Sequence, residues 1–357
     1  MNRVARMVSR MIIMRFVPIL LGLSLFVITL EVVTYAKEIL ELSNDGLMII
    51  AKYILARFPA TLATFLPISL LLSLLLTVTE LSYRNELTAI WSIGLSPSRL
   101  ILTLAPLALV IGVIHFAIVD RAVPAAAPVL RSWGIADYGE KKLKIGEKDP
   151  IWLRSGTDIM RAAGANRDAT RLSDVVIFKR DSSGILLEQI FAEAASLGPE
   201  GWVLQNVVVY NNGTAAPVRS TQLVYAGTMR AAEAGSRSGD PEEMTISDLS
   251  YFIANDGFGI RPTYVYQTWW HKRVSLIFVS FIMVCLIVPL ATRFRRGGGL
   301  GVLFAVGVGL GFSFFILDGI AVSIGELGAV FPWLAAWLPV LVFGALSLYL
   351  LAKSERV

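Results

Sequence analysis

The chain has 357 residues, of which 55% are hydrophobic and only 17% are charged. With a mean hydropathy of +0.66, this composition excludes a soluble globular protein, because such a fold cannot hide so much apolar surface from water. The net charge of +5 does not indicate nucleic-acid binding, because the early arginines lie beside apolar runs, as in cytoplasmic flanks of membrane proteins. The single cysteine, Cys285, excludes an internal disulfide and a cysteine-ligated structural zinc site.

Six stretches with few or no charges approach the roughly 20 residues that a helix needs to cross a bilayer. In chain order they are residues 16–36, 58–79, 100–119, 274–292, 297–317 and 327–352. Arginine-rich flanks before the first stretch and between the fourth and fifth predict that these flanks, and hence both chain ends, are cytoplasmic. The alternative that the first stretch belongs to a cleaved signal peptide has less support, because it is longer than a signal core and no A-x-A pattern follows it.

The long hydrophilic interval after the third stretch is predicted to be a periplasmic domain. Its central part, residues 150–228, contains short β-rich segments divided by turn residues. The candidate strands are residues 151–154, 158–162, 175–180, 185–195, 202–210 and 218–226. Five or six strands of this kind predict a small antiparallel sandwich or open roll. A linker and a short amphipathic helix, with Ser247 as its N-cap, follow.

The predicted fold class is therefore an α-helical polytopic membrane protein with an inserted all-β domain. The predicted organisation is helices in residues 1–119, the β-domain with its flanking linkers in 120–272, and helices in 273–357. Each helical part contributes three of the six spans.

Residues 84–95, between the second and third spans, are too polar to cross a membrane and too apolar for an idle loop. Leu87, Ile90 and Trp91 share one helical face, and Gly94 suits a C-terminal cap. The pattern predicts a short helix that presents an exposed apolar ridge. Such a helix either docks a partner and transmits its movement to two spans, or lies flat on the membrane surface. Composition favours neither alternative.

The motifs of common enzyme classes are missing. The sequence contains no G-x-x-x-x-G-K-[ST], H-E-x-x-H or G-x-S-x-G pattern, so any ATP hydrolysis is assigned to a partner and no catalytic residue is predicted. Glu31, His115 and Asp318 lie in or beside spans, where a proton-coupled transporter would use them. The stronger interpretation is that all three lie near span ends and reach lipid headgroups or water.

The fifth span carries Gly297, Gly301, Gly307 and Gly311, which include two G-x-x-x-G pairs. Small residues at this spacing permit close contact between helices in a membrane. The motif is common and weakly specific, but it predicts that this span packs against, or slides along, another subunit.

Over almost its whole length the chain resembles the LptF/LptG family of lipopolysaccharide export permeases. The order of three spans, an exported domain and three spans is the same. The N-E-L triplet at 85–87, followed by Gly94, resembles the family's coupling helix, and residues 120–124 resemble the exit from its third span. The F-I-L-D run at 315–318, with later prolines, looks more like the LptG branch than the LptF branch.

The resemblance implies a permease subunit of an ATP-driven exporter that extracts lipopolysaccharide from the bacterial inner membrane and passes it to a periplasmic bridge. It implies a jellyroll-like periplasmic domain, lateral gates at spans one and five, and no cofactor in this chain. The implied partners are an LptF-like permease, an LptB-like ATPase dimer, an LptC-like single-span protein and an LptA-like bridge. The rival hypotheses are a non-transporting scaffold that anchors the β-domain, and a proton-coupled transporter.

The site residues that the resemblance implies form three groups. The ATPase contact consists of coupling-helix residues Arg84, Glu86, Leu87, Ile90, Trp91 and Gly94. Lipid phosphates are bound near the outer end of span one, where the basic residues of this chain are Lys37, Lys52 and Arg57. Lys52 and Arg57 enter as substitutes, because Glu38 and Glu41 occupy positions where relatives carry further basic residues. The lateral gate and subunit packing are assigned to Gly301, Gly307, Gly311 and Asp318.

Overall fold

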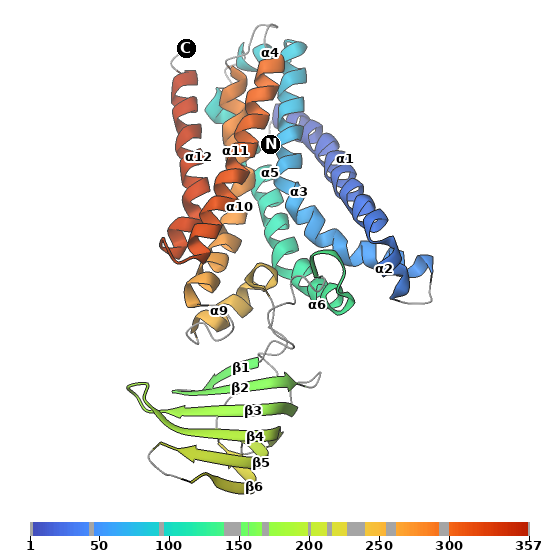
Figure 1. Ribbon diagram of the computed structural model, residues 1–357. Coiled ribbons are helices and arrows are strands. Elements are labelled where there is room, and N and C mark those ends of the chain that lie inside the picture. The colour runs from blue at the N-terminus through green and yellow to red at the C-terminus, as the bar shows by residue number, and fades with distance from the viewer. Residues whose placement is uncertain are drawn as a thin grey trace. The chain divides into compact units, whose positions relative to one another are not determined.

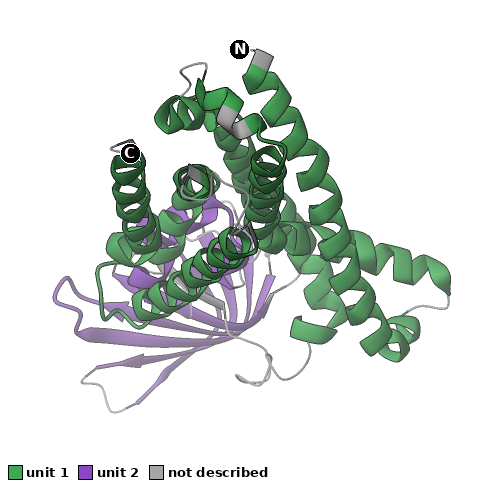
Figure 2. Cartoon of the chain, turned by 90° about the horizontal axis from the view of Figure 1, so that it is seen from above, with its two compact units in different colours: residues 1–139, 267–357 green, residues 140–266 purple. Residues whose placement is uncertain are grey.

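The computed structural model describes residues 3–42, 46–92, 96–138, 151–155, 157–165, 171–198, 201–212, 216–226, 240–254, 262–292 and 300–355. The chain divides into two compact units, one of residues 1–139 with 267–357 and the other of residues 140–266 (Figure 2). The first unit is helical, and the second contains a β-sheet (Figure 1). The chain therefore contributes to the helical unit both before and after the β-rich unit.

Six helices in the described part of the chain are long and apolar enough to cross a membrane, which confirms the predicted number of spans. They begin with α1 (Arg3–Thr34), α3 (Leu47–Tyr83) and α5 (Pro97–Ala117), and they end with α10 (Thr263–Thr292), α11 (Leu300–Glu326) and α12 (Pro332–Glu355). The short helix α4 (Glu86–Ser92) lies at the end of this bundle where α12 finishes, and α2 (Ala36–Glu41) lies at the other end (Figure 1).

The third membrane-length helix continues beyond its predicted end at residue 119. It consists of α5, a π-helical turn η1 (Ile118–Ala122) and α6 (Val123–Trp133). The prediction stopped before Asp120 because a charge is costly in lipid, but Asp120 is only 3% exposed within the protein. Beside this turn, the buried Arg273 of α10 donates a hydrogen bond from Nη1 to the Val119 carbonyl over 2.8 Å. Protein, rather than water or lipid, thus surrounds the polar groups at this point.

Helices α3 and α10 form the centre of the bundle. Their most apolar windows are 67% and 72% buried, whereas those of α1 and α11 are each only 22% buried. The centre is tightly packed where α5 meets α10, because a Cβ atom on Gly112 would lie 2.1 Å from the Ile277 carbonyl oxygen. Helices α1 and α11 therefore present broad apolar faces outward.

The second unit contains a six-stranded antiparallel sheet in which each strand pairs with its neighbours in sequence. Its strands are β1 (Ile151–Ser155), β2 (Asp158–Ala165), β3 (Arg171–Arg180), β4 (Leu186–Gly198), β5 (Gly201–Asn211) and β6 (Val218–Tyr225). Every candidate strand identified in the sequence is present, because alternation and turn residues report on local structure.

The sheet curls so that its sides approach each other. Strands β2 and β6 are four positions apart in the sheet, a separation of roughly 19 Å if the sheet were flat. The hydroxyl of Tyr225, at the end of β6, nevertheless donates to Oδ2 of Asp158, at the start of β2, over 2.6 Å. Ile177, Trp202 and Leu204 are fully buried. The sheet therefore forms an open roll around its own apolar side chains.

Substitution of Tyr225 by phenylalanine is expected to loosen the roll. Burial and the hydrogen bond to Asp158 raise the pKa of Tyr225 above its ordinary value. This stabilisation is therefore complete below about pH 10 and is lost as the pH rises above the ordinary tyrosine pKa. We expect Tyr225→Phe to cost about 1–2 kcal/mol of folding stability near neutral pH. Because phenylalanine does not ionise, we also expect the variant to lose less further stability than the wild type above about pH 10.

The rate of proteolytic cleavage in β6, measured on the full chain in detergent near neutral pH and above about pH 10, checks this expectation. Tyr210→Phe is the matched control, because Tyr210 is 49% exposed on β5. Equal cleavage rates for Tyr225→Phe and the wild type near neutral pH would contradict the expectation.

A short helix, α9 (Ile246–Ala254), occupies the position predicted for an amphipathic helix, but its cap differs from the prediction. Thr245, not Ser247, caps it: Thr245 Oγ1 accepts from the Asp248 amide at 3.1 Å, and Asp248 Oδ2 accepts from the Thr245 amide at 3.3 Å. The reciprocal pair is a capping box, in which both orphan amides are satisfied. The Ser247 prediction is therefore wrong by two positions.

Candidate functional site

The predicted short helix between the second and third spans is present as α4, but two of its apolar side chains, Ile90 and Trp91, pack against the bundle. Asn85 links α3 to α4 in a left-handed conformation, with φ of 59°. Ile90 is 5% exposed and belongs to the core of the bundle, and Trp91 packs partly buried against that core. Ala89 is exposed and Glu86 is half-buried. The predicted exposed ridge is therefore wrong for Ile90.

The physical reason is that α4 covers the ends of its own neighbouring helices. Helical spacing predicts that apolar residues share a face, but not whether the partner of that face is the same chain or another subunit. Leu87 belongs to the helix, and Gly94 lies outside the described residues. Among the residues whose side chains are described, those that a partner could reach here include the exposed Tyr83, Arg84 and Ala89 and the half-buried Glu86.

An ion-pair network ties the start of α1 to the end of α3 that leads into α4. Arg15 of α1 pairs with Glu80 of α3 and donates to Thr77 Oγ1 over 2.9 Å. The other Glu80 oxygen lies 2.7 Å from Arg84 Nη2. A pocket of about 600 Å³ lies beside this network, lined by four residues of α1 and four of α3. Arg84, which lies two residues before α4, is thus connected to α1 through Glu80.

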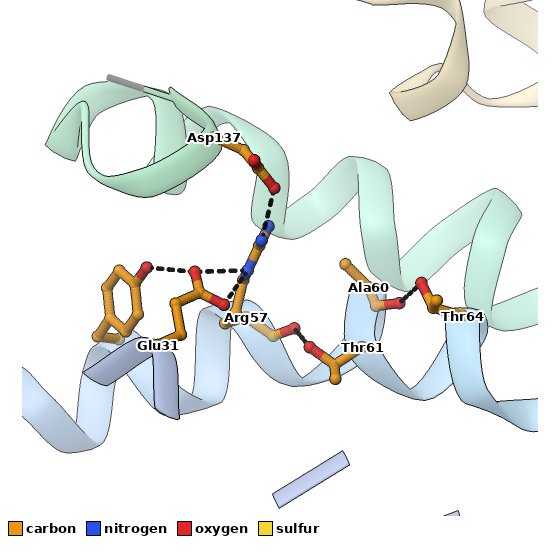
Figure 3. A network of polar contacts seen from close by, with 7 residues as sticks. Glu31, Arg57, Ala60, Thr61, Thr64 and Asp137 are labelled. Carbon is orange, nitrogen blue, oxygen red and sulfur yellow. Dashed lines mark hydrogen bonds and ion pairs between the residues drawn. The ribbon is translucent and has the colours of Figure 1, made fainter. Parts of the chain in front are cut away.

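A second charged cluster joins α1, α3 and the short turn η2 (Ala136–Tyr138) that follows α6 (Figure 3). Arg57 Nε lies 2.9 Å from the Glu31 carboxylate, and Arg57 Nη2 donates to Asp137 Oδ2 over 2.8 Å. Tyr53 donates to Glu31 Oε1 over 2.6 Å, and the Arg57 guanidinium lies 5.8 Å from the centre of the Tyr138 ring. Three segments that are distant in sequence therefore meet at one arginine.

This cluster changes the interpretation of the basic residues assigned to lipid phosphates. Arg57 is engaged by two carboxylates, and its side chain is 16% exposed. Lys37 is 87% exposed, 4.0 Å from Glu41, and Lys52 is exposed on α3. The structure thus offers Lys37 and Lys52 to solvent, whereas Arg57 becomes available to an anion only by exchange. Phosphate binding by any of them stays a prediction.

The ionisable residues expected to reach headgroups or water lie inside the protein instead. Glu31 is 12% exposed in the cluster around Arg57, and His115 is 3% exposed. Asp318 of α11 forms an ion pair with Lys272 of α10, and the two side chains are only 21% and 11% exposed. Asp318, assigned above to a lateral gate or subunit packing, therefore has a partner within its own chain.

The glycines of α11 also pack within the chain. Cβ atoms on Gly307 and Gly311 would lie 2.4 Å and 2.6 Å from methyl carbons of Leu75 and Leu71 of α3, respectively. The two glycines and the two leucines have matching four-residue spacings, so each glycine accommodates one leucine. Gly301, by contrast, has open space around its Cβ position. The side of α11 that carries Gly307 and Gly311 therefore faces α3 of the same chain, and the assignment of these glycines to a lateral gate stays a prediction.

Several residues of these clusters were not predicted from the sequence: Arg15, Tyr53, Thr77, Glu80, Asp137 and Tyr138. Tyr53 and Asp137 are marked by no local motif, because their partners lie 22 and 80 residues away in the chain. Glu80 has one distant partner, Arg15, and one local partner, Arg84, at the i, i+4 spacing. Two signals were available in the sequence: the opposite charges of Glu31 and Arg57 near adjoining span ends, and those of Glu80 and Arg84 at the i, i+4 spacing. Among the described residues, no group of three histidine, cysteine, aspartate or glutamate side chains is placed to hold a metal ion.

Six membrane-length helices, with a rolled β-sheet inserted between the third and fourth, define a polytopic membrane protein with the architecture of a permease subunit. The chain belongs to the lipopolysaccharide export system permease LptF/LptG family, whose model matches residues 6–353. The resemblance noted from the sequence is confirmed. The family is one of transport permeases and not of enzymes.

Individual relatives agree with this assignment at low identity but high coverage. The chain is 23% identical over 311 residues to LptG of Escherichia coli K12, covering 85% of each protein. It is 23% identical over 309 residues to LptG of Haemophilus influenzae, covering 83% of this chain and 84% of the relative. It is 26% identical over 311 residues to LptF of Escherichia coli K12, covering 82% of this chain and 79% of the relative.

Proposed function

We propose that this chain is the permease subunit, in the LptG position, of an ATP-driven exporter that extracts lipopolysaccharide from the inner membrane. In this proposal an LptF-like permease completes the cavity, and an LptB-like ATPase dimer binds at α4. An LptC-like single-span protein and an LptA-like bridge receive the lipid. The names of the relatives, lipopolysaccharide export permeases LptG and LptF, support the substrate.

The observation that carries the proposal is the place of α4 in the bundle. Ile90 anchors α4 in the same apolar core as α3 and α5, and Glu86 remains accessible at its start. A force applied by a partner at Glu86 therefore reaches two membrane-length helices without slack, because a packed core is stiff. The link from Arg84 through Glu80 to Arg15 extends this path to α1.

The orientation follows from the distribution of basic residues. Arg6 and Arg10 near the start of α1 are exposed, and Lys353 lies in the last turn of α12. Because cytoplasmic flanks are enriched in lysine and arginine, both chain ends and α4 lie in the cytoplasm in this proposal. The β-rich unit follows the C-terminal end of α6 and precedes the N-terminal end of α10. In this proposal it therefore lies in the periplasm.

The outward faces of α1 and α11 suit contact with lipid and a second permease. Large apolar side chains point outward on both helices, including Phe26 and Val33 on α1 and Phe312 and Ile316 on α11. Burial of such surface is favourable by about 25 cal/mol per Å² when water would otherwise cover it, and in a bilayer acyl chains cover it instead. A cavity between two permeases would hold the acyl chains of the substrate against these faces.

A non-transporting scaffold that anchors the β-rich unit is the main rival. It has no use for a short helix rigidly connected to three membrane-length helices. Proton coupling is disfavoured by the ion pairs of Glu31 and Asp318, because each carboxylate already has a cationic partner.

Glu86→Ala and Ala89→Arg are expected to remove the ATPase from the purified complex without removing the second permease. Truncating a charged contact in an interface costs about 2–5 kcal/mol, so we expect at least about a tenfold loss of co-purified ATPase from detergent-solubilised membranes. Glu41→Ala is the matched control, because Glu41 is an exposed carboxylate on α2, at the other end of the bundle. Absence of an ATPase from the folded wild-type complex would favour the scaffold.

A further inference from the structure

The five residues 134–138, which follow α6, hold a carboxylate against Arg57 in a strained conformation. Gly134 ends α6 with φ of 62°, and Ala136 is also left-handed, with φ of 56°. This region is unfavourable for a residue with a Cβ atom and persists only where surrounding contacts enforce it. Ile135, which is 5% exposed in an apolar cluster with Tyr53, holds one side of Ala136, and the bond from Asp137 to Arg57 holds the other. The segment is therefore strained and doubly anchored.

The two carboxylates on Arg57 are not equivalent. The Glu31 side chain is 12% exposed and receives a second hydrogen bond, from Tyr53. The Asp137 side chain is 63% exposed. Because solvent weakens exposed ion pairs far more than buried ones, the contact with Asp137 is the one that exchanges readily. Glu31 and Tyr53 remain to hold the arginine in place.

The guanidinium group of Arg57 also has hydrogen-bond donors that neither carboxylate uses. Its Nε is committed to Glu31 and its Nη2 to Asp137, while its Nη1 donates to no residue in the described part of the chain. If Asp137 moved away, the edge formed by the two Nη atoms would match a phosphate, which guanidinium groups bind through two parallel hydrogen bonds. A lipid phosphate carries more negative charge than a single carboxylate and offers more acceptor oxygens. Exchange of Asp137 for phosphate would also relieve the strain at Ala136.

We propose that Asp137 is an internal substitute for a lipid phosphate, which displaces it from Arg57 when the lipid binds. This inference rests on the proposed function, which supplies a phosphorylated lipid as substrate. Arg57 stays bound to Glu31, and the released segment 134–138 is the start of the connection between the helical unit and the β-rich unit. Substrate binding at the membrane is thereby coupled to the chain segment that leads to the β-rich unit.

The test compares lipid binding by the full chain in detergent micelles for wild type, Asp137→Asn, Arg57→Gln and the double variant. The probes are lipid A with its phosphates, dephosphorylated lipid A and phosphatidylglycerol. Removing an exposed competing carboxylate is expected to raise affinity for phosphorylated lipid A by about two- to fivefold, with no gain for the dephosphorylated lipid. Arg57→Gln is expected to lower the affinity and to abolish the effect of Asp137→Asn. Glu193→Gln, an equal change of charge at an exposed position of β4 in the β-rich unit, is the control.

Each result has a defined meaning. An equal gain for phosphatidylglycerol would support the exchange and show that the site accepts any lipid phosphate, whereas a gain confined to lipid A would assign it to that lipid. An unchanged affinity in Asp137→Asn, or a gain that persists without Arg57, would overturn the inference and leave the proposed function intact. If folded wild-type protein bound no lipid A, the proposed function itself would fail.

A second variant acts in the opposite direction. Ala136→Gly removes the strain of the left-handed conformation and so stabilises the segment on Arg57, because glycine adopts positive φ without a steric cost. We therefore expect Ala136→Gly to weaken binding of phosphorylated lipid A, by about two- to fivefold. Tighter binding in this variant would contradict the exchange.

Discussion

Replacement of Gly112 by alanine is expected to push α5 away from α10 and to destabilise the helical unit by about 2 kcal/mol or more. The new Cβ atom would lie 2.1 Å from the carbonyl oxygen of Ile277 and 2.9 Å from its carbonyl carbon. A backbone carbonyl within a helix cannot rotate aside as a side chain can, so the helices themselves must separate. Because α10 is the most buried of the membrane-length helices, this separation disturbs the centre of the bundle.

Thermal unfolding of the full chain in detergent measures this effect. Gly22→Ala is the matched control, because nothing lies within 4 Å of the Cβ position of Gly22 on α1. The expected result is a lowered melting temperature and a smaller monodisperse fraction for Gly112→Ala alone. Identical melting of the two variants would show that α5 and α10 are not in close contact in the membrane protein.

Lys272→Met is expected to destabilise the same unit by about 3–5 kcal/mol, the usual cost of removing one partner of a buried ion pair. The substitution leaves the Asp318 carboxyl group without its cationic partner while its side chain is only 21% exposed. The substitution also removes the ion pair that links α10 to α11. The neighbouring residue of α10, Arg273, is buried.

The double variant Lys272→Met with Asp318→Leu separates this explanation from a simple packing defect. Two apolar side chains replace a buried pair at little cost, so the double variant is expected to melt close to the wild type in the same detergent experiment. If the two substitutions instead destabilise additively, the pair makes no net contribution and the explanation is wrong.

The elements of the fold were accessible from the sequence because each leaves a local signal. Membrane-length helices need long apolar runs, and strands need alternation between turn residues, so six spans and six strands were identified before the structure. The end of the third span was missed because Asp120 marks a boundary only if it faces lipid or water. Its burial at 3% exposure depends on neighbouring helices that no local pattern reveals.

The candidate site could be predicted from the sequence only in part, because its contacts join residues that are distant in the chain. The position of α4 follows from local composition, but the inward orientation of Ile90 depends on which surface covers it. The spacing of the glycines in α11 predicted a close helix contact. Only the tertiary structure shows that the partners are Leu71 and Leu75 of α3. The meeting of Glu31, Arg57 and Asp137 joins side chains 26 and 80 positions apart, and only the folded chain shows it.

The most direct test of the central claim is ATP-dependent removal of lipopolysaccharide from vesicles that contain this chain, its second permease and the ATPase. The account predicts that lipopolysaccharide leaves the vesicles for a periplasmic acceptor when ATP is added, that phosphatidylglycerol stays behind, and that Glu86→Ala stops the release. If ATP is hydrolysed by the assembled complex while lipopolysaccharide remains in the vesicles, the chain is not the permease of a lipopolysaccharide exporter.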